Sequence, residues 1–238
     1  MISRTIKFAA LFAAAAVSHT AMAATEQVDV AWKGNAALTG ERMKAFVDGA
    51  QVYGGSRGAL AHELGYTQLA AGTSTSFEAF CIEPTQPNSK LTATYEKSVL
   101  GGTEGKLLAA LYTTSYKTGA GAAWDSVAQA AFQTAVWELT QEKAVNGSAT
   151  YGILDGNFSV TGASSVTTLA STFLASALSY TGTSTYSVYK LTNGDYQDLV
   201  VASPFTSPAG VVPEPESYAL LLAGLGVVAW VARRRQAR

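Results

Sequence analysis

The chain has 238 residues, of which 48% are hydrophobic and only 14% are charged. This length suits one or two domains, and the apolar content excludes wholesale disorder. The 16 basic and 17 acidic residues give a formal net charge of −1, and six of the basic residues lie at the two ends. The body between them is net acidic without a basic stripe, which argues against nucleic-acid binding.

The N-terminus reads as a secretory signal peptide over residues 1–23. Arg4 and Lys7 precede the apolar run FAALFAAAAV, and small residues follow at the end of this segment. A positive start, a short apolar run and a small-residue cleavage site are the three parts of an export signal. We therefore expect signal peptidase to cut between Ala23 and Ala24, which leaves His62 and Cys81 as the histidine and cysteine of the mature chain. These two residues are too few for a zinc cluster, and no metal or cofactor is expected.

The body, residues 24–203, starts with strand-like segments and continues with helical ones. Apolar and β-prone residues between Gly, Asn and Thr breaks predict strands. These segments are residues 28–32, 43–55, 76–84 and 91–100. Apolar residues at helical spacing predict three helices. These are residues 104–116, 124–143 and 165–180, with Gly182 as the cap of the third.

The middle helix is apolar on two sides. One stripe runs from Trp124 to Leu139, and Ala130, Gln133 and Trp137 lie on roughly the opposite side. Such a helix is usually sandwiched between layers, so Gln133 would need a polar partner in a semi-buried seam.

The body ends in a predicted hairpin with Asn193-Gly194 as its turn, because this dipeptide separates two β-prone runs. Strands, then helices, then strands again predict an α+β fold. We expect a β-sandwich or barrel-like body with a helical insertion.

The C-terminal region has three parts. Four of the six prolines fall within the stretch SPFTSPAGVVPEPES, so residues 204–216 are predicted to form a semi-rigid stalk. Residues 217–238 contain a 16-residue apolar run, which predicts a transmembrane helix in the inner membrane, and Arg233, Arg234 and Arg235, which keep the tip on the cytoplasmic side.

Pro213-Glu214-Pro215, the apolar helix and the arginine cluster together resemble the PEP-CTERM sorting signal of Gram-negative bacteria. The resemblance covers about the last 26 residues. It implies an exosortase-type enzyme as partner, cleavage near Pro213-Glu214-Pro215, and delivery to the cell surface or extracellular matrix of a biofilm-forming bacterium. A plain membrane anchor is the alternative.

Two further motifs resemble those of the thioester domains of bacterial surface adhesins. The first is Phe80-Cys81 at the end of a predicted strand. The second is Phe132-Gln133 followed by Thr-Ala-Val on the two-sided helix. The resemblance implies that Cys81 and Gln133 form an internal thioester with loss of ammonia.

A thioester carbonyl is an activated acyl group, which an amine or a hydroxyl of a surface or matrix target can attack. The product is a covalent tether that forms once, so this reading predicts no enzyme. Aromatic residues next to the two motifs are expected to keep the site dry; these are Phe80, Phe132 and Trp137.

Three alternatives remain open from the sequence. Cys81 could also be an ordinary small core residue, and Gln133 an ordinary residue on the surface of a helix. The protein would then be a non-covalent matrix or binding protein. Gln129, one turn earlier, is a second candidate acyl donor. A hydrolase with Cys81 as nucleophile and His62 as general base is the enzymatic alternative.

Overall fold

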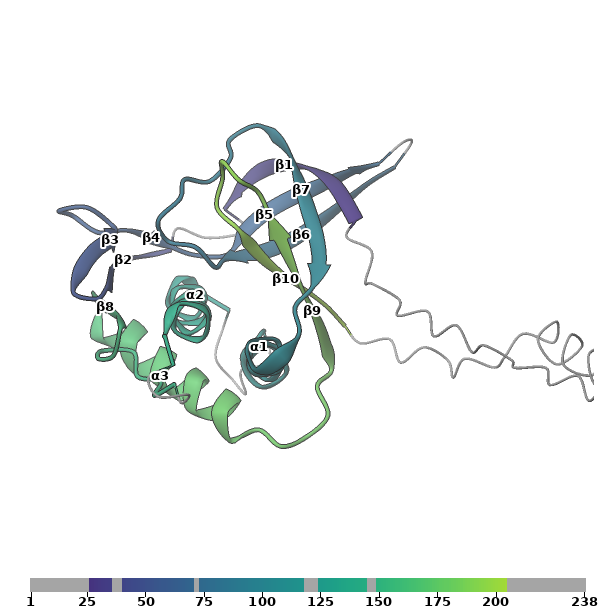
Figure 1. The fold of residues 1–238 in the computed structure, drawn as a ribbon. Helices are drawn as coiled ribbons and strands as arrows, with labels where there is room; N and C mark the ends of the chain where they lie inside the picture. The colour runs from purple at the N-terminus through teal and green to yellow at the C-terminus, as the bar shows by residue number, and fades with distance from the viewer. Residues whose placement is uncertain (1–25, 36–39, 71–72, 118–123, 145–148, 205–238) are drawn as a thin grey trace, which may run out of the picture.

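The structure, a computed structural model, describes residues 26–35, 40–70, 73–117, 124–144 and 149–204. Within these ranges six antiparallel strands close into a barrel, and three helices lie against one side of it (Figure 1). The barrel strands are β1 (Glu26–Asn35), β5 (Leu64–Ala70), β6 (Thr73–Cys81), β7 (Thr92–Val99), β9 (Tyr186–Thr192) and β10 (Leu199–Pro204).

The barrel closes because β1 pairs on both edges. Glu26 lies opposite Lys97 of β7, and Asp29 lies opposite Leu69 of β5. The remaining order around the barrel is β5, β6, β10, β9 and β7. Alternate residues of each strand face the interior, where large side chains fill the middle of the lumen. Tyr66 and Tyr95 are each 1% exposed there.

A second, smaller sheet lies beside the barrel. It consists of β2 (Glu41–Val47), β3 (Ala50–Tyr53), β4 (Ala59–Ala61) and β8 (Phe158–Gly162). β2 is its centre and pairs antiparallel with each of the other three strands. The turn between β2 and β3 has positive φ at Asp48 and Gly49, as a tight two-residue hairpin requires. The sequence indicated a single β-prone stretch here, and the structure divides it into two strands.

The helices are α1 (Gly102–Ser115), α2 (Ser126–Gln141) and α3 (Ser164–Ser179). Every residue of α2 from Ala128 to Leu139 is buried, because α1 and α3 contact it as well as strands of both sheets. The expectation of a helix sandwiched between layers is therefore confirmed. Its start is fixed by the Asp125 carboxylate, which accepts a hydrogen bond of 2.8 Å from the Ala128 N–H.

The fold is α+β, and of the two architectures that the sequence predicted, the structure shows the barrel. The helices together with β8 form the insertion, between β7 and β9. Two local predictions are wrong. Gly182 does not cap α3, since the helix ends at Ser179 and its C-cap residue, Tyr180, is extended. The predicted hairpin itself is present, since β9 and β10 pair antiparallel. Asn193-Gly194 is not its two-residue turn, because the two strands are joined by residues 193–198, where the Asn193 side chain accepts bonds from the N–H groups of Asp195 and Tyr196.

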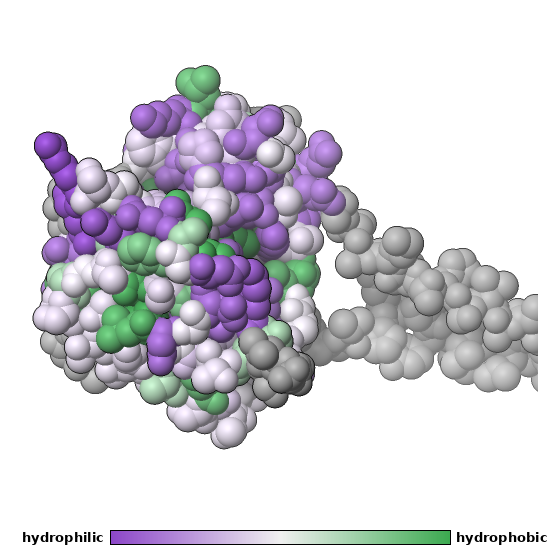
Figure 2. Space-filling view, turned by 60° about the vertical axis from the view of Figure 1, so that its left-hand side comes forward, coloured by the Kyte–Doolittle hydropathy of each residue, from purple (hydrophilic) through white to green (hydrophobic). Residues whose placement is uncertain are grey.

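The surface of the body mixes hydrophilic residues with small hydrophobic areas (Figure 2). No helix in the described part of the chain is long and apolar enough to cross a membrane. The predicted signal peptide, stalk and C-terminal transmembrane helix, with the cleavage and sorting residues named above, lie outside the described residues.

Candidate functional site

Cys81 is the last residue of β6, and the pleat of that strand directs neighbouring side chains to opposite faces. Phe80 faces the helices, where its ring lies 4.7 Å from the ring of Phe132 and 6.3 Å from that of Tyr112. Cys81 shares the lumen-facing side with Phe77 and Thr75. The sulfur therefore lies at one end of the barrel, on the side of the sheet away from the aromatic core.

Gln133 of α2 lies directly beside Cys81. Its side-chain nitrogen donates a hydrogen bond of 2.7 Å to the Cys81 carbonyl, and its Oε1 accepts one of 2.9 Å from the Cys81 N–H. These backbone groups face away from β10, since the neighbouring Ile82 N–H bonds Asp198 instead. On the other edge β5 does not reach Cys81, because β5 begins at Leu64 and Leu64 pairs with Ala79 of β6. The Gln133 amide therefore takes the place that a further strand residue would occupy.

The Cys81 sulfur faces two amide side chains from loops. Sγ lies 2.5 Å from Gln197 Oε1 and 3.6 Å from Asn88 Oδ1. Gln197 is itself fixed, because its side-chain nitrogen donates to the Glu83 carbonyl and its backbone N–H donates to the Pro87 carbonyl. The sulfur is thus held on one side by acceptors, while the Gln133 amide lies beside the backbone of the same residue.

Burial controls the protonation of this site. It raises the pKa of the Cys81 thiol well above its usual range, since the buried environment disfavours the charged thiolate. The sulfur and the Gln133 amide border a cavity of about 130 Å³. Its wall includes Tyr53, Trp137 and His62, and no residue that lines it carries a carboxylate, ammonium or guanidinium group. The thiol therefore rests as neutral S–H in a site without charged side chains.

The three aromatic residues that were predicted to surround the thioester lie in two different parts of the structure. Trp137 lines the cavity and packs edge-on against Tyr53 at 4.8 Å between ring centroids. Phe80 and Phe132 are buried in the aromatic core between β6 and the helices and do not line the cavity.

The two residues on which the alternative predictions depend, His62 and Gln129, also lie in different places. His62 lines the cavity, and its Nδ1 lies 3.0 Å from the Glu63 carbonyl oxygen. Gln129 is completely buried but does not line the cavity, and neither polar atom of its amide has a hydrogen-bond partner among the described residues. A cysteine hydrolase needs its base beside the sulfur, whereas the hydrogen-bond partners of Cys81 Sγ are the amide oxygens of Gln197 and Asn88.

The sequence reading missed Gln197, Asn88 and Gln86, which line the cavity from the loops after β6 and before β10. These loops have no hydrophobic period, although Pro84 and Pro87 favour extended backbone in the first of them. No signal in the sequence links position 197 to position 81.

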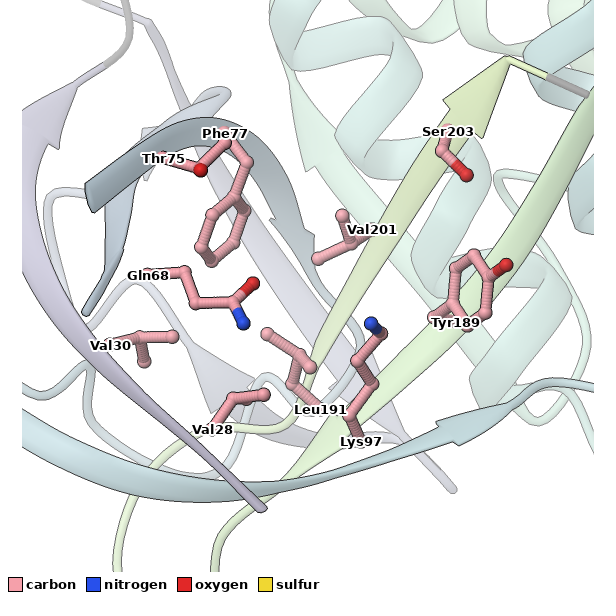
Figure 3. A pocket seen from close by; sticks show the side chains of 10 residues that line it. All are labelled: Val28, Val30, Gln68, Thr75, Phe77, Lys97, Tyr189, Leu191, Val201 and Ser203. Carbon is pink, nitrogen blue, oxygen red and sulfur yellow. The ribbon is translucent and has the colours of Figure 1, made fainter. Parts of the chain in front are cut away.

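A second cavity, of about 180 Å³, lies at the other end of the lumen. Its wall is mainly apolar, and Gln68 and Lys97 project into it from β5 and β7 (Figure 3). Val28, near the start of β1, and Ser203, near the end of β10, both line it. The described chain therefore begins and ends at the barrel end opposite Cys81. The part of the chain that the structure describes contains no group of three His, Cys, Asp or Glu side chains that could hold a metal ion.

Comparison with known proteins identifies the C-terminal region. Residues 211–236 match the PEP-CTERM protein-sorting motif. This motif marks exported proteins that are sorted to the cell surface or the extracellular space, with processing by an exosortase. No curated protein matches the chain in sequence.

Two solved structures resemble the body. One is the N-terminal thioester domain of a surface protein from Clostridium perfringens, at 12% identity with a TM-score of 0.35, over 67% of this chain and 97% of that one. The other is a cysteine-to-alanine mutant of such a domain from the same organism. It matches at 11% identity with a TM-score of 0.41, over 68% of this chain and 99% of that one.

Proposed function

We propose that this exported surface protein forms an internal thioester between Cys81 Sγ and Gln133 Cδ, and that it uses the thioester to tether itself covalently to a surface or matrix component. The observation that carries the proposal is the pair of hydrogen bonds between the Gln133 amide and the backbone N–H and carbonyl of Cys81. Both residues line one cavity. A surface amide that served only solubility would not be held in this way.

The bond-forming step requires positioning more than acid–base strength. The Cys81 sulfur adds to the Gln133 amide carbon, the C–N bond breaks, and the thiol proton leaves with the nitrogen as ammonia. The Cys81 N–H already donates to Gln133 Oε1, so it can stabilise the negative charge that develops on this oxygen. Fixing the two reacting groups side by side supplies effective concentration, which is the main requirement for a weak electrophile such as an amide.

The buried setting also protects the product. A thioester exposed to water hydrolyses, whereas here Gln133 is 1% exposed and Cys81 is 6% exposed. When a target nucleophile reaches the acyl carbon, the thiol leaves and the target remains bound to Gln133. Each molecule reacts once, so the process is a ligation and not enzymatic turnover.

The arrangement of the chain suits such a tether. We propose a signal peptide over residues 1–23, removed between Ala23 and Ala24, a body over 24–203, a stalk over 204–216 and a sorting helix over 217–238. The described chain ends at the barrel end opposite Cys81. In this layout the reactive end faces away from the cell-attached end, toward the target.

The intact mass of the purified exported protein tests the proposal. A thioester lowers the mass by about 17 Da, the mass of ammonia, and methylamine then adds to Gln133 and frees the Cys81 thiol. The Cys81→Ala variant should show neither the loss nor the adduct. Gln129→Leu, which removes a buried amide outside the cavity, should keep both.

An unmodified mass together with native-state alkylation of Cys81 contradicts the proposal. The protein would then be a non-covalent matrix or binding protein, in which the Gln133 amide serves only to hydrogen-bond the backbone N–H and carbonyl of Cys81 at the end of β6.

A further inference from the structure

The cavity beside Cys81 is polar yet uncharged. Amide side chains of Gln86, Asn88 and Gln197 share its wall with the rings of Tyr53 and Trp137. Two acidic residues follow lining residues in the sequence, but their carboxylates bind other groups. Glu63 accepts hydrogen bonds from Tyr116 and Trp124, and Asp198 pairs with Lys190. An alkylammonium ion that entered would lose its hydration and meet no carboxylate, which is costly. A neutral hydroxyl compound would not carry this cost.

Two polar atoms at this cavity have no partner among the described residues. They are the Nε1 donor of Trp137, whose side chain is 1% exposed, and the Oε1 acceptor of Gln86. Buried polar atoms are normally hydrogen-bonded, so an unpaired donor and an unpaired acceptor on two residues that line one cavity would both be satisfied by a ligand that donates and accepts. A hydroxyl group does both, whereas an ammonium ion only donates.

His62 lines this cavity and is the residue there whose neutral side chain can act as a base. Because its Nδ1 lies 3.0 Å from a carbonyl oxygen, which can only accept, Nδ1 carries the hydrogen and Nε2 of the neutral ring carries the free electron pair. An alcohol is a weak nucleophile until a base removes its proton, whereas a free amine needs no such help to attack.

We propose that the target of this site is a neutral primary hydroxyl, of the kind that a saccharide carries, and that His62 is the general base that activates it. This inference rests on the proposed thioester. A cavity of about 130 Å³ is slightly smaller than one of ~150 Å³ that holds benzene, so it admits a hydroxymethyl arm and not a whole sugar ring. The ring would remain outside, against the loop that carries Gln86 and Asn88.

The hydroxyl oxygen adds to the Gln133 acyl carbon while His62 Nε2 takes the hydroxyl proton. The C–S bond then breaks, and His62 returns the proton to the departing Cys81 sulfur. The products are an ester between Gln133 and the saccharide, a free Cys81 thiol and an unchanged histidine.

The test compares two probes on the purified full chain by intact mass. Maltotriose offers primary hydroxyls and no charge, and Nα-acetyl-lysine amide offers an amine at the same concentration. The expected result is a maltotriose adduct that forms faster than the lysine adduct and that hydroxylamine removes, as an ester requires. His62→Gln should slow the maltotriose reaction about 100-fold and leave the methylamine reaction nearly unchanged.

A second variant separates recognition from base catalysis. Trp137→Phe keeps a ring but removes the unpaired N–H, so it should slow maltotriose more than methylamine. If methylamine adds but the lysine probe outpaces maltotriose, or if His62→Gln slows both reactions equally, the inference is wrong and the thioester stands. If the mass loss of about 17 Da and the methylamine adduct are both missing, the proposed function itself fails, and this inference fails with it.

Discussion

The two ends of the barrel are built from the same strands but differ in what closes them. At one end β6 contributes Thr75 and Phe77 to an apolar cavity where the described chain begins and ends (Figure 3). Six residues after Thr75, about 20 Å along the strand, the same face contributes Cys81 to a polar cavity covered by α2 and two loops. Because alternate residues of a strand point into the barrel, inward-facing side chains are present at both ends of the lumen. The Gln133 amide is present at only one of them because α2 crosses the barrel there.

The largest expected difference between the two ends concerns their glutamines. In a Cys81→Ala background, where no thioester can form, Gln133→Leu leaves the N–H and carbonyl of residue 81 buried without partners, which should lower the free energy of unfolding by about 2–4 kcal/mol. Gln68→Leu is the matched change at the apolar end. Gln68 is half-buried and makes no side-chain hydrogen bond with another described residue, so this change should shift stability by less than about 0.5 kcal/mol.

Urea unfolding followed by circular dichroism measures both variants. Equal losses for Gln133→Leu and Gln68→Leu would show that the bonds at Cys81 contribute nothing to stability, and the contrast between the ends would then be lost.

A carboxyl on the helix that closes the Cys81 end gives a pH-dependent effect. Glu138 is completely buried, and burial, aided by nearby Glu142 and Asp155, raises its pKa to about 8. Between the unfolded value of about 4.3 and pH 8 the folded protein keeps a proton that the unfolded chain releases, so stability falls as pH rises through this window. Above pH 8 this contribution is constant.

Glu138→Gln removes this titration but keeps the bond from the Gly152 N–H to Oε1. We expect no difference from the parent near pH 4 and a stabilisation on the order of 2 kcal/mol near pH 8. Melting temperatures recorded from pH 4 to 8 measure it. Gln68→Leu, which changes no titrating group, should follow the parent profile, and a parallel profile for Glu138→Gln would show that Glu138 ionises normally.

The sequence predicted the parts of the site that sit on regular elements. Cys81 ends a strand with recognisable β-prone residues, and Gln133 stands on a helix with two apolar faces, so both could be placed before the fold was known. The structure brings them together. Whether they react is still a prediction that the mass measurement decides.

The rest of the cavity could not be predicted, for a physical reason. Gln197 and Asn88 lie in loops whose course depends on how β6, β7, β9 and β10 pair, and such pairing joins residues far apart in the chain. The Asn193-Gly194 prediction failed in the same region. A local turn preference was overridden by Asp198, which accepts a bond from the Asn193 N–H and so widens the connection to six residues.

The smallest expected difference concerns one ion pair at each end. Lys190 Nζ lies 2.8 Å from Asp198, whose side chain is 10% exposed, beside the loop that carries Gln197. Lys97 Nζ lies 3.0 Å from Glu26, which is 57% exposed, at the apolar end. Lys190→Met leaves a largely buried carboxylate without its cation and should cost about 1 kcal/mol, whereas Lys97→Met should cost roughly 0–0.5 kcal/mol. Urea unfolding in low salt and in 1 M NaCl measures both, and high salt should erase the Lys97 effect first because exposed charges are screened more strongly. Equal losses that salt erases equally would mean that both barrel ends are equally open to solvent, and the protected character of the Cys81 end would then have to be given up.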